Sequence, residues 1–298
     1  EMSEKVKNAL FDKKPVVALE STILTHGFNK PHNFELALKA ESIISSFGVT
    51  PATIAVIDGK IKIGLSKNEI ELICYKDNLK KISIMDLSNS ILKKKTGGTT
   101  VAATVYIANL YHIKVFVTGG IGGVHRGFKN NFDISADLNT ISRSKIFTIC
   151  SGPKAVLDVP KTIENIETLG IQLFTYKSKN IPLFWSRNSE IKSLNNIKNL
   201  KELVDIYNIN QKLSNPSGML IFNPIPKKYE IPFNEINPII SASIKKMKTK
   251  NITGKEVTPF LLKEIEKKTN GLSIRSNKEL LYNNALIGAK LSLLLDNK

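Results

Sequence analysis

The chain has 298 residues, the length of one large or two ordinary domains, and 42% of them are hydrophobic, which is enough to build a packed core. These values exclude a disordered tail and a small disulfide-stabilised protein. The formal net charge is +17, but 39 lysines and only four arginines carry the positive side of that balance. Proteins that read nucleic acids rely on arginine for bidentate contacts, so the surplus favours diffuse surface charge and is only weak evidence for a nucleic-acid partner; we expect none.

The cysteines and the apolar runs indicate where the protein works. Cys74 and Cys150 each stand among apolar residues, which is typical of buried free thiols in a reducing compartment. No apolar run approaches the roughly 20 residues that a membrane span needs. The first ten residues lack the apolar core of a signal peptide. We therefore expect a soluble cytoplasmic protein without a membrane partner.

The first third of the chain alternates short β-branched runs with segments of helical periodicity. A strand is expected at 14–22, and an amphipathic helix at 34–47 that stops at Gly48. Asp58-Gly59 separates two strand-like runs and predicts a hairpin, because both turn positions tolerate positive φ. Residues 66–69, Ser-Lys-Asn-Glu, read as a capping box that opens another helix.

The remainder repeats the theme of an apolar strand followed by a polar or glycine-rich loop. Strands are expected at 80–87, 113–120, 145–150 and 218–226, and a small-residue-rich helix at 97–113. This alternation predicts a three-layer α/β/α fold around a central, mostly parallel or mixed sheet. We expect one domain over residues 1–298, with the polar, Asn-rich stretch 181–203 as a surface excursion. In such folds ligands gather at the carboxyl ends of strands.

Two residues at such strand ends could carry chemistry. Glu20 ends the apolar strand VVALE, and a carboxyl group held at the lip of a core can have a raised pKa and act as a general acid near neutrality. Lys154, in the loop SGPK, follows a buried strand, and a poorly solvated amine there could act as a nucleophile. The competing interpretation makes both residues solvated surface charges.

The glycine-rich run 119–123 could expose backbone N–H groups to a phosphate, or could simply form a tight turn. It is neither a Walker A loop nor a dinucleotide-binding fingerprint. Shortly after it, Asp133 and Asp137 stand four residues apart and would share one helix face. They could hold a hard divalent cation, or Asp133 could cap the helix while Asp137 is solvated.

Two further groups allow either a binding or a structural interpretation. Thr99 and Thr100 open a predicted helix and could grip a phosphate with Lys81 as counter-charge, or could serve only as an N-cap. Trp185 with Phe184 could stack on a base, although an isolated pair of this kind also suits core packing.

Taken together, these segments resemble the pseudouridine-5′-phosphate glycosidase family, also called indigoidine-synthase-A-like. The resemblance runs in one order from about residue 14 to about residue 294, almost the whole chain. Its most specific parts are VTGGIGGVHRG and FDISADL. The other segments that carry it are ALEST followed by HG, PATIAVI, GLSK, GGTTVA, SGPK, NPIP and GKEVTPFLL.

The resemblance implies a pseudouridylate synthase, a lyase classed among the carbon–oxygen hydro-lyases that acts as a C-glycosidase. Pseudouridine 5′-phosphate is split reversibly into uracil and ribose 5-phosphate in nucleotide catabolism. By this analogy the sugar ring opens and Lys154 forms a Schiff base at the former anomeric carbon, which serves as an electron sink. Glu20 matches the proton donor. The two-carboxylate scheme of O-glycosidases does not suit a C–C bond.

The resemblance also implies a binding site, a cofactor and partners. Asp133 matches the ligand of one Mn²⁺ ion per subunit, for which Mg²⁺ could substitute. A homotrimer and a functional link to a pseudouridine kinase are implied as well. The implied substrate-binding residues are Lys81, Thr100, Val101 through its backbone, His125, Ser135, Ala136, Asp137 and Asn277.

Two alternatives remain open at this stage. One keeps the fold and the Lys154 imine but acts on another sugar phosphate, as an aldolase-like lyase or in indigoidine formation. The other, from a different class, is a non-catalytic lysine-rich nucleic-acid-binding protein. The scarcity of arginine and the lack of an aromatic stacking platform argue against it.

Overall fold

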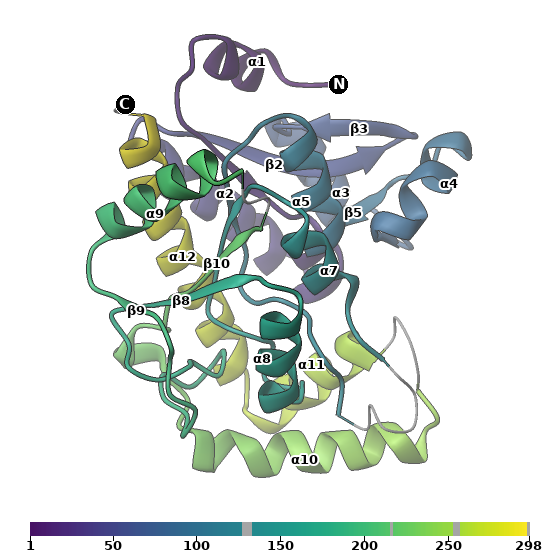
Figure 1. Ribbon diagram of the computed structural model, residues 1–298. Helices are drawn as coiled ribbons and strands as arrows, with labels where there is room; N and C mark the ends of the chain where they lie inside the picture. The colour runs from purple at the N-terminus through teal and green to yellow at the C-terminus, as the bar shows by residue number, and fades with distance from the viewer. Residues whose placement is uncertain (127–132, 215–216, 253–256, 297–298) are drawn as a thin grey trace.

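The structure is a computed structural model, which describes residues 1–126, 133–214, 217–252 and 257–296. Parts of three segments that carry the family resemblance, in VTGGIGGVHRG, FDISADL and GKEVTPFLL, lie outside the described residues. The chain forms one sheet with helices on both faces. The long helix α12 runs behind the sheet in Figure 1, and α10 lies across the bottom of the view.

The strands are β1 Val16–Leu19, β2 Thr50–Ile57, β3 Lys60–Ile63, β4 Lys80–Ile82, β5 Gly97–Thr99, β6 Val115–Val117, β7 Phe147–Cys150, β8 Gln172–Tyr176, β9 Asn196–Ile197 and β10 Met219–Phe222. The helices are α1 Glu4–Phe11, α2 His32–Ser45, α3 Lys67–Tyr75, α4 Leu87–Leu92, α5 Val101–Leu110, α7 Ala136–Ser142, α8 Val159–Thr168, α9 Leu200–Lys212, α10 Phe233–Thr249, α11 Val257–Lys268 and α12 Leu272–Asp296. Shorter helical turns are η1 Ile23–Gly27, η2 Ile84–Asp86 and η3 Lys227–Tyr229.

The sheet is mixed but mostly parallel. Its ten strands follow the order β4-β5-β2-β1-β6-β7-β10-β8-β9, and β3 pairs with β2. Strands β2, β1, β6, β7, β10, β8 and β9 run parallel to one another, whereas β3 and β5 pair antiparallel with β2. The predicted three-layer fold with a mostly parallel or mixed sheet is confirmed.

Alternation of side chains along the central strands builds two cores. In β1, Val17 and Leu19 face one core while Val16 and Ala18 face the other. Helices α2, α9, α10, α11 and α12 cover the first core, and α1, α5, α7 and α8 cover the second. Because both faces are covered, the central strands are apolar throughout instead of alternating with polar residues.

Local signals in the first third of the chain fold as the sequence predicts. Asp58 and Gly59 both have positive φ and join the antiparallel strands β2 and β3. Ser66 and Glu69 form both hydrogen bonds of the capping box at the start of α3. None of the helices in the described part of the chain has the length and apolar character that crossing a bilayer requires.

Three segments differ from the expectation. The strand expected at 80–87 covers only β4, Lys80–Ile82, because η2 follows at Ile84 and α4 begins at Leu87. The helix expected at 97–113 begins only at Val101, because Gly97–Thr99 forms β5, a strand at which the missing side chains permit close approach to β4. The stretch 181–203 begins with the buried residues 181–186 and adds β9 to the sheet edge, so only its later part is surface-exposed.

Neighbouring strands bring distant loops together. Leu19 pairs with Val117, and Val117 pairs with Ile149, so β1, β6 and β7 end side by side at one edge of the sheet. The residues that follow these strands begin at Glu20, Thr118 and Ser151. The polar loops that follow these three strands therefore lie next to one another at this edge, as the sequence predicts for ligand-binding loops.

Candidate active site

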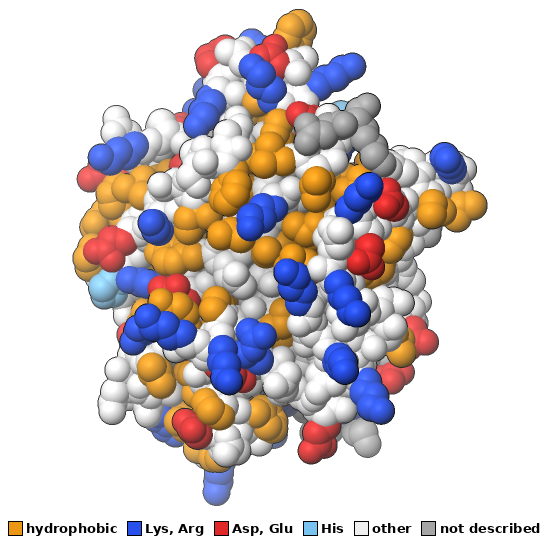
Figure 2. Space-filling view, turned by 90° about the vertical axis from the view of Figure 1, so that its left-hand side faces the viewer, with side chains coloured by type: hydrophobic (Ala, Val, Ile, Leu, Met, Phe, Trp, Pro, Cys, Tyr) orange, Lys and Arg blue, Asp and Glu red, His pale blue; other side chains and the backbone are white. Residues whose placement is uncertain are grey.

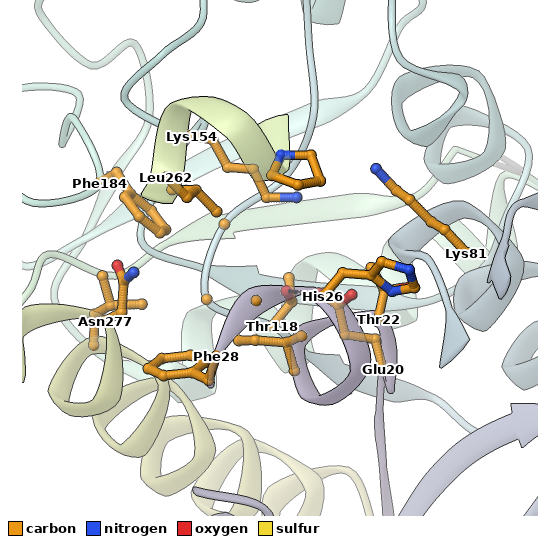
Figure 3. A pocket seen from close by; sticks show the side chains of 16 residues that line it. Glu20, Thr22, His26, Phe28, Lys81, Thr118, Lys154, Phe184, Leu262 and Asn277 are labelled. Atoms are coloured by element: carbon orange, nitrogen blue, oxygen red, sulfur yellow. Dashed lines mark hydrogen bonds between the residues drawn. The ribbon is translucent and has the colours of Figure 1, made fainter. Parts of the chain in front are cut away.

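A pocket lies at the carboxyl ends of β1, β6 and β7 (Figure 3). Glu20, Lys81, Lys154 and Asn277, which are predicted site residues, line it together. The remaining walls are Thr22, Ile23, His26, Gly27, Phe28, Thr118, Gly119, Gly120, Phe184, Pro259, Leu262 and Leu280. One carboxyl group and two amines thus share a cavity whose walls are otherwise largely apolar.

Glu20 lies at the floor of this pocket and is almost cut off from water. Its side chain is 6% exposed, and its Oε1 accepts a 2.5 Å hydrogen bond from Thr118 Oγ1. Burial raises the pKa of the Glu20 carboxyl group above its ordinary value, while the charge of Lys154 and the Thr118 hydrogen bond act in the opposite direction. The side chain is therefore suited to hold and deliver a proton.

The residues after Glu20 fasten the end of β1 to its neighbours. Ser21 is fully buried, and its hydroxyl donates to the Ile54 carbonyl and accepts from the Thr99 amide. Thr22 donates its hydroxyl proton to the carbonyl of Gly98. The sequence EST thus supplies one carboxyl group for the pocket and two hydroxyls that fix its position relative to β2 and β5.

Lys154 reaches the pocket from a loop held in a fixed shape. Gly152 has φ +102°, and a Cβ there would stand 2.4 Å from the carbonyl oxygen of Pro182, so only glycine fits. Lys154 N–H donates to the carbonyl of Ile121, and Lys154 accepts from the amide of Leu157. The backbone on both sides of the amine-bearing residue is therefore anchored.

Lys81 enters from β4 on the other side of the pocket. In Figure 3 the amines of Lys81 and Lys154 extend toward the same part of the cavity, above the Glu20 carboxyl group. Both positive charges lower the pKa of Glu20 against the effect of burial. Two cations close to one carboxyl group leave a net positive cavity, which suits an anionic ligand.

Asn277 and an aromatic wall close the opposite side. Trp185 is buried in the core, and its Nε1 donates a 2.5 Å hydrogen bond to Asn277 Oδ1, which fixes the amide of Asn277. Phe184 packs against Trp185 with ring centroids 5.2 Å apart and itself lines the pocket, as Phe28 does. Phe184 therefore forms part of the pocket wall, and Trp185 holds both Phe184 and Asn277 in place from behind.

The glycine-rich loop owes its composition to close packing. Gly120 lies against the ring of Phe184, and a Cβ there would stand 2.6 Å from two ring atoms. A Cβ on Gly122 would stand 2.3 Å from the Ser135 hydroxyl, and one on Gly123 2.4 Å from Thr162. None of these glycines has positive φ, so close contact with Phe184, Ser135 and Thr162, and no left-handed backbone conformation, is what excludes side chains here.

Asp137 is a structural clamp in this structure. Its carboxylate is buried, with Oδ1 accepting from the Ala102 amide at 3.0 Å and Oδ2 from the Gly122 amide at 2.7 Å. The expectation that Asp137 is solvated and Asp133 caps the helix is wrong, because Ser135 is the N-cap of α7. Asp137 instead joins the start of α5 to the glycine-rich loop.

Thr100 caps α5, and its hydroxyl accepts from the Ala103 amide at 3.3 Å. Since Asp137 takes the Ala102 amide, two of the first three amides of α5 are engaged. Among the described residues we find no partner for the amide of Val101. The lining of the pocket does not include five of the predicted binding residues, which are Thr100, Val101, Ser135, Ala136 and Asp137.

His125 and Asp133 form a second polar group beside the pocket. Asp133 Oδ2 lies 3.9 Å from His125 Nδ1, and the Asp133 side chain is 34% exposed. The pKa of His125 lies below its ordinary value. Burial is the main cause, and the charges of Lys154 and Lys81 act in the same direction, whereas the Asp133 carboxylate acts against them. The described residues contain no group of three or more His, Cys, Asp or Glu side chains that could hold a metal ion.

Sequence reasoning missed several residues of the pocket. Thr118 contacts Glu20, and His26 and Phe28 come from the turn and loop after β1. The threonine directly follows the strand VFV and could have been found from the rule that ligands gather at strand ends. Leu262 and Pro259 come from a helix far away in sequence, and no local pattern marks them.

Comparisons with known proteins show relatives that match almost the whole chain. The sequence profile of the family described as "Indigoidine synthase A like protein" matches residues 5–293. A curated relative from Petrotoga mobilis, named pseudouridine-5′-phosphate glycosidase, is 46% identical, with 98% of this chain and 95% of the relative covered. One of the same name from Staphylococcus aureus is 42% identical, with 98% and 95% covered.

Two solved structures share the fold. An indigoidine synthase A (IdgA)-like protein from Thermotoga maritima superposes with a TM-score of 0.88 at 34% identity, with 95% of this chain and 93% of the other covered. The prealnumycin C-glycosynthase AlnA, solved in complex with ribulose 5-phosphate, gives a TM-score of 0.91 at 29% identity, with 100% and 97% covered.

The buried carboxyl group predicts a stability effect. A carboxyl group whose pKa is raised on folding binds its proton more tightly in the folded state, so it costs stability as the pH rises above its unfolded pKa. Glu20→Gln removes this cost, about 1.4 kcal/mol for each unit of upward shift. We expect the variant to be more stable than the parent at pH 8 and equally stable at pH 4, in urea titrations. A variant less stable at pH 8 would contradict the account.

Proposed function

Because the chain belongs to the family of indigoidine synthase A like proteins, we propose that it cleaves the C–C glycosidic bond of pseudouridine 5′-phosphate reversibly, giving uracil and ribose 5-phosphate. The observation that carries the proposal is that the buried carboxyl group of Glu20 and the amine of Lys154 line the same pocket, whose other walls are largely apolar. A C–C glycosidic bond needs both a nucleophile for C1′ and an acid for the departing carbon.

The amine of Lys154 allows a covalent route through a bond to C1′ of the sugar. Lys154 Nζ first gives its ammonium proton to water; its lone pair then forms a bond to C1′ as the bond from C1′ to the ring oxygen breaks, and a second proton lost by nitrogen passes to that oxygen. The nitrogen lone pair then forms the C1′=N bond, while the electron pair of the bond to uracil passes to uracil C5. Water adds to C1′ and releases the amine, leaving the aldehyde of ribose 5-phosphate.

Glu20 manages the proton of the cleavage step. Its carboxyl group delivers a proton to uracil C5 and regains one when water adds to the imine, so it ends the cycle as it began. Burial raises the pKa of the Glu20 carboxyl group and so favours its protonated form, and Thr118 holds one carboxyl oxygen in place. In the synthetic direction the same iminium accepts the electrons of uracil C5.

The phosphate would lie between β4 and the start of α5. Lys81 lines the pocket and supplies a positive charge there, and Val101 is the first residue of the ten-residue helix α5, whose N-terminal amides could bind an anion. The structure of AlnA with ribulose 5-phosphate supports a sugar phosphate as the ligand class. Among the substrate-binding residues that the resemblance implies, Asn277 lines the pocket and would contact the substrate directly, and His125, Ser135 and Ala136 would border the phosphate side.

We propose that Asp133 holds a Mn²⁺ ion, or Mg²⁺ in its place. A single partly exposed carboxylate fits a hard cation that keeps most of its waters, because such ions rarely require an all-protein cage. When bound, the ion would neutralise phosphate charge. His125 lies beside Asp133 and would orient its carboxylate.

The assembly and setting expected from the sequence stay predictions: a homotrimer, a cytoplasmic location and a functional link to a pseudouridine kinase. Sedimentation velocity checks the first, and a sedimentation coefficient that fits a monomer at micromolar concentration would contradict it.

Lysine and arginine side chains are scattered among other residues on the face shown in Figure 2, which gives no support to a nucleic-acid surface there.

Release of uracil tests the proposed function. The protein with Mn²⁺ and pseudouridine 5′-phosphate should form uracil and ribose 5-phosphate in equal amounts, followed by chromatography. Lys154→Ala should remove turnover while the fold persists, because no amine remains to form the imine. Lys80→Ala changes an exposed lysine outside the pocket and is the control.

Uracil formation by Lys154→Ala at a rate near the parent's would contradict the imine route. No uracil from the parent protein would overturn the proposed function. Cleavage of another phosphorylated sugar by the parent would then favour the alternative lyase of the same fold.

The phosphate subsite predicts a selective effect on binding. Lys81→Ala removes a charge-assisted contact, so KM for pseudouridine 5′-phosphate should rise about 10- to 100-fold. Lys80→Ala should leave KM unchanged, because Lys80 is the exposed neighbour on the same strand. Steady-state kinetics on both variants checks this, and equal KM values for the two would contradict the assignment of Lys81.

The metal proposal predicts that Asp133→Asn weakens Mn²⁺ binding at least about tenfold, since one carboxylate supplies the only charged ligand. Electron paramagnetic resonance of free Mn²⁺ during titration measures the affinity without substrate. Glu164→Gln, at an exposed carboxylate on α8, is the control. Unchanged affinity in Asp133→Asn would remove Asp133 from the site.

A further inference from the structure

Beneath the pocket, Asn284 of α12 is fully buried and uses both sides of its amide. Its Nδ2 donates to the carbonyl of Thr118 at 2.9 Å and to the hydroxyl of Ser151 at 3.1 Å. Its Oδ1 accepts from Asn223 Nδ2 at 2.9 Å. One side chain thus joins the residues that directly follow β6, β7 and β10.

Two of those partners lead directly to the reacting groups. Thr118, whose carbonyl Asn284 holds, donates its own hydroxyl proton to Glu20. Ser151 begins the loop SGPK, three residues before Lys154. The distance between the carboxyl group and the amine therefore depends on how the ends of β6 and β7 are held relative to each other.

The helix is shaped to bring this amide into place. A Cβ on Gly288 would stand 2.4 Å from a methyl group of Val117, so a glycine there lets α12 lie directly on β6. Asn284 lies about one turn before Gly288, and Asn277 two turns before Asn284, on the same face. One helix face therefore supplies a wall of the pocket and the support below it.

We propose that Asn284 is a positioning residue, which clasps the ends of β6 and β7 and so fixes the Glu20 and Lys154 side chains relative to each other. Only asparagine among residues of this size offers two donors and an acceptor in one plane. Aspartate keeps the shape but has no N–H to donate. Leucine keeps the approximate volume and leaves three polar groups unpaired.

The consequence for turnover rests on the proposed function. Substrate contacts in the pocket walls remain when Asn284 is changed, so KM should move little. The relative position of acid and nucleophile changes, and a misplacement of about 1 Å can cost about 100-fold in rate. We therefore expect Asn284→Asp and Asn284→Leu to lower kcat about 10- to 100-fold, with KM within about threefold of the parent.

Asn210→Leu is the matched control. Asn210, on α9, is also buried, and its amide pairs with Gln172 of β8 through hydrogen bonds of 2.8 and 3.1 Å. Its loss should lower the melting temperature much as Asn284→Leu does, but leave kcat unchanged. Ser151→Ala, a milder change to the same clasp, should lower kcat by about threefold to tenfold and keeps the test decisive if the Asn284 variants do not fold.

A second readout needs no substrate. The carbonyl stretch of the protonated Glu20 carboxyl group, identified by its absence in Glu20→Gln, can be titrated by infrared difference spectroscopy. A loosened Thr118 donates less well to Glu20, so Asn284→Asp and Asn284→Leu should raise the pKa of Glu20 above the parent value. Asn210→Leu should not.

The two readouts separate the inference from the proposed function. If the parent protein does not cleave pseudouridine 5′-phosphate, the proposed function fails while the Glu20 titration still tests the clasp. The inference is overturned if the Asn284 variants and Ser151→Ala keep the parent's Glu20 titration. It is equally overturned if their kcat falls no further than that of Asn210→Leu.

Discussion

A carboxyl group that is nearly cut off from water at the end of β1 is the constraint on which the rest of the site depends. Glu20 is 6% exposed, and an ionised carboxylate in such a place is costly unless cations or donors compensate it. Thr118 supplies a donor, and Lys154 and Lys81 supply positive charge. Burial thus raises the pKa of Glu20 while its neighbours lower it, and the proposed proton transfer to carbon depends on this opposition.

The parallel arrangement of β1, β6 and β7 is what makes this balance achievable. Their carboxyl ends meet at one edge, so the carboxyl group, its hydroxyl partner and the amine-bearing loop come from three short loops. The glycine-rich loop remains thin because Phe184, Ser135 and Thr162 press against it. Asp137 accepts a buried hydrogen bond from the Gly122 amide, and Asn284 donates one to the Thr118 carbonyl, so both side chains hold the loop after β6 in position.

Local features of the sequence predicted much of the fold, because apolar alternation, the Asp58-Gly59 turn and the Ser66 cap act over a few residues. Glu20 and Lys154 could be singled out because each lies shortly after an apolar strand, Glu20 directly after β1 and Lys154 in the loop after β7. The role of Asp137 could not, since its partners at 102 and 122 are distant in sequence. The same holds for Asn284, whose three partners lie 61 to 166 residues away.

The central claim is that the amine of Lys154 bonds to the sugar carbon, and reductive trapping tests it most directly. The protein is mixed with ribose 5-phosphate, reduced with borohydride and digested, and the peptides are read by mass spectrometry. The account predicts one modified lysine, Lys154, in a chain that has 39. A stable adduct on a different lysine, or no adduct at saturating ribose 5-phosphate, would contradict it.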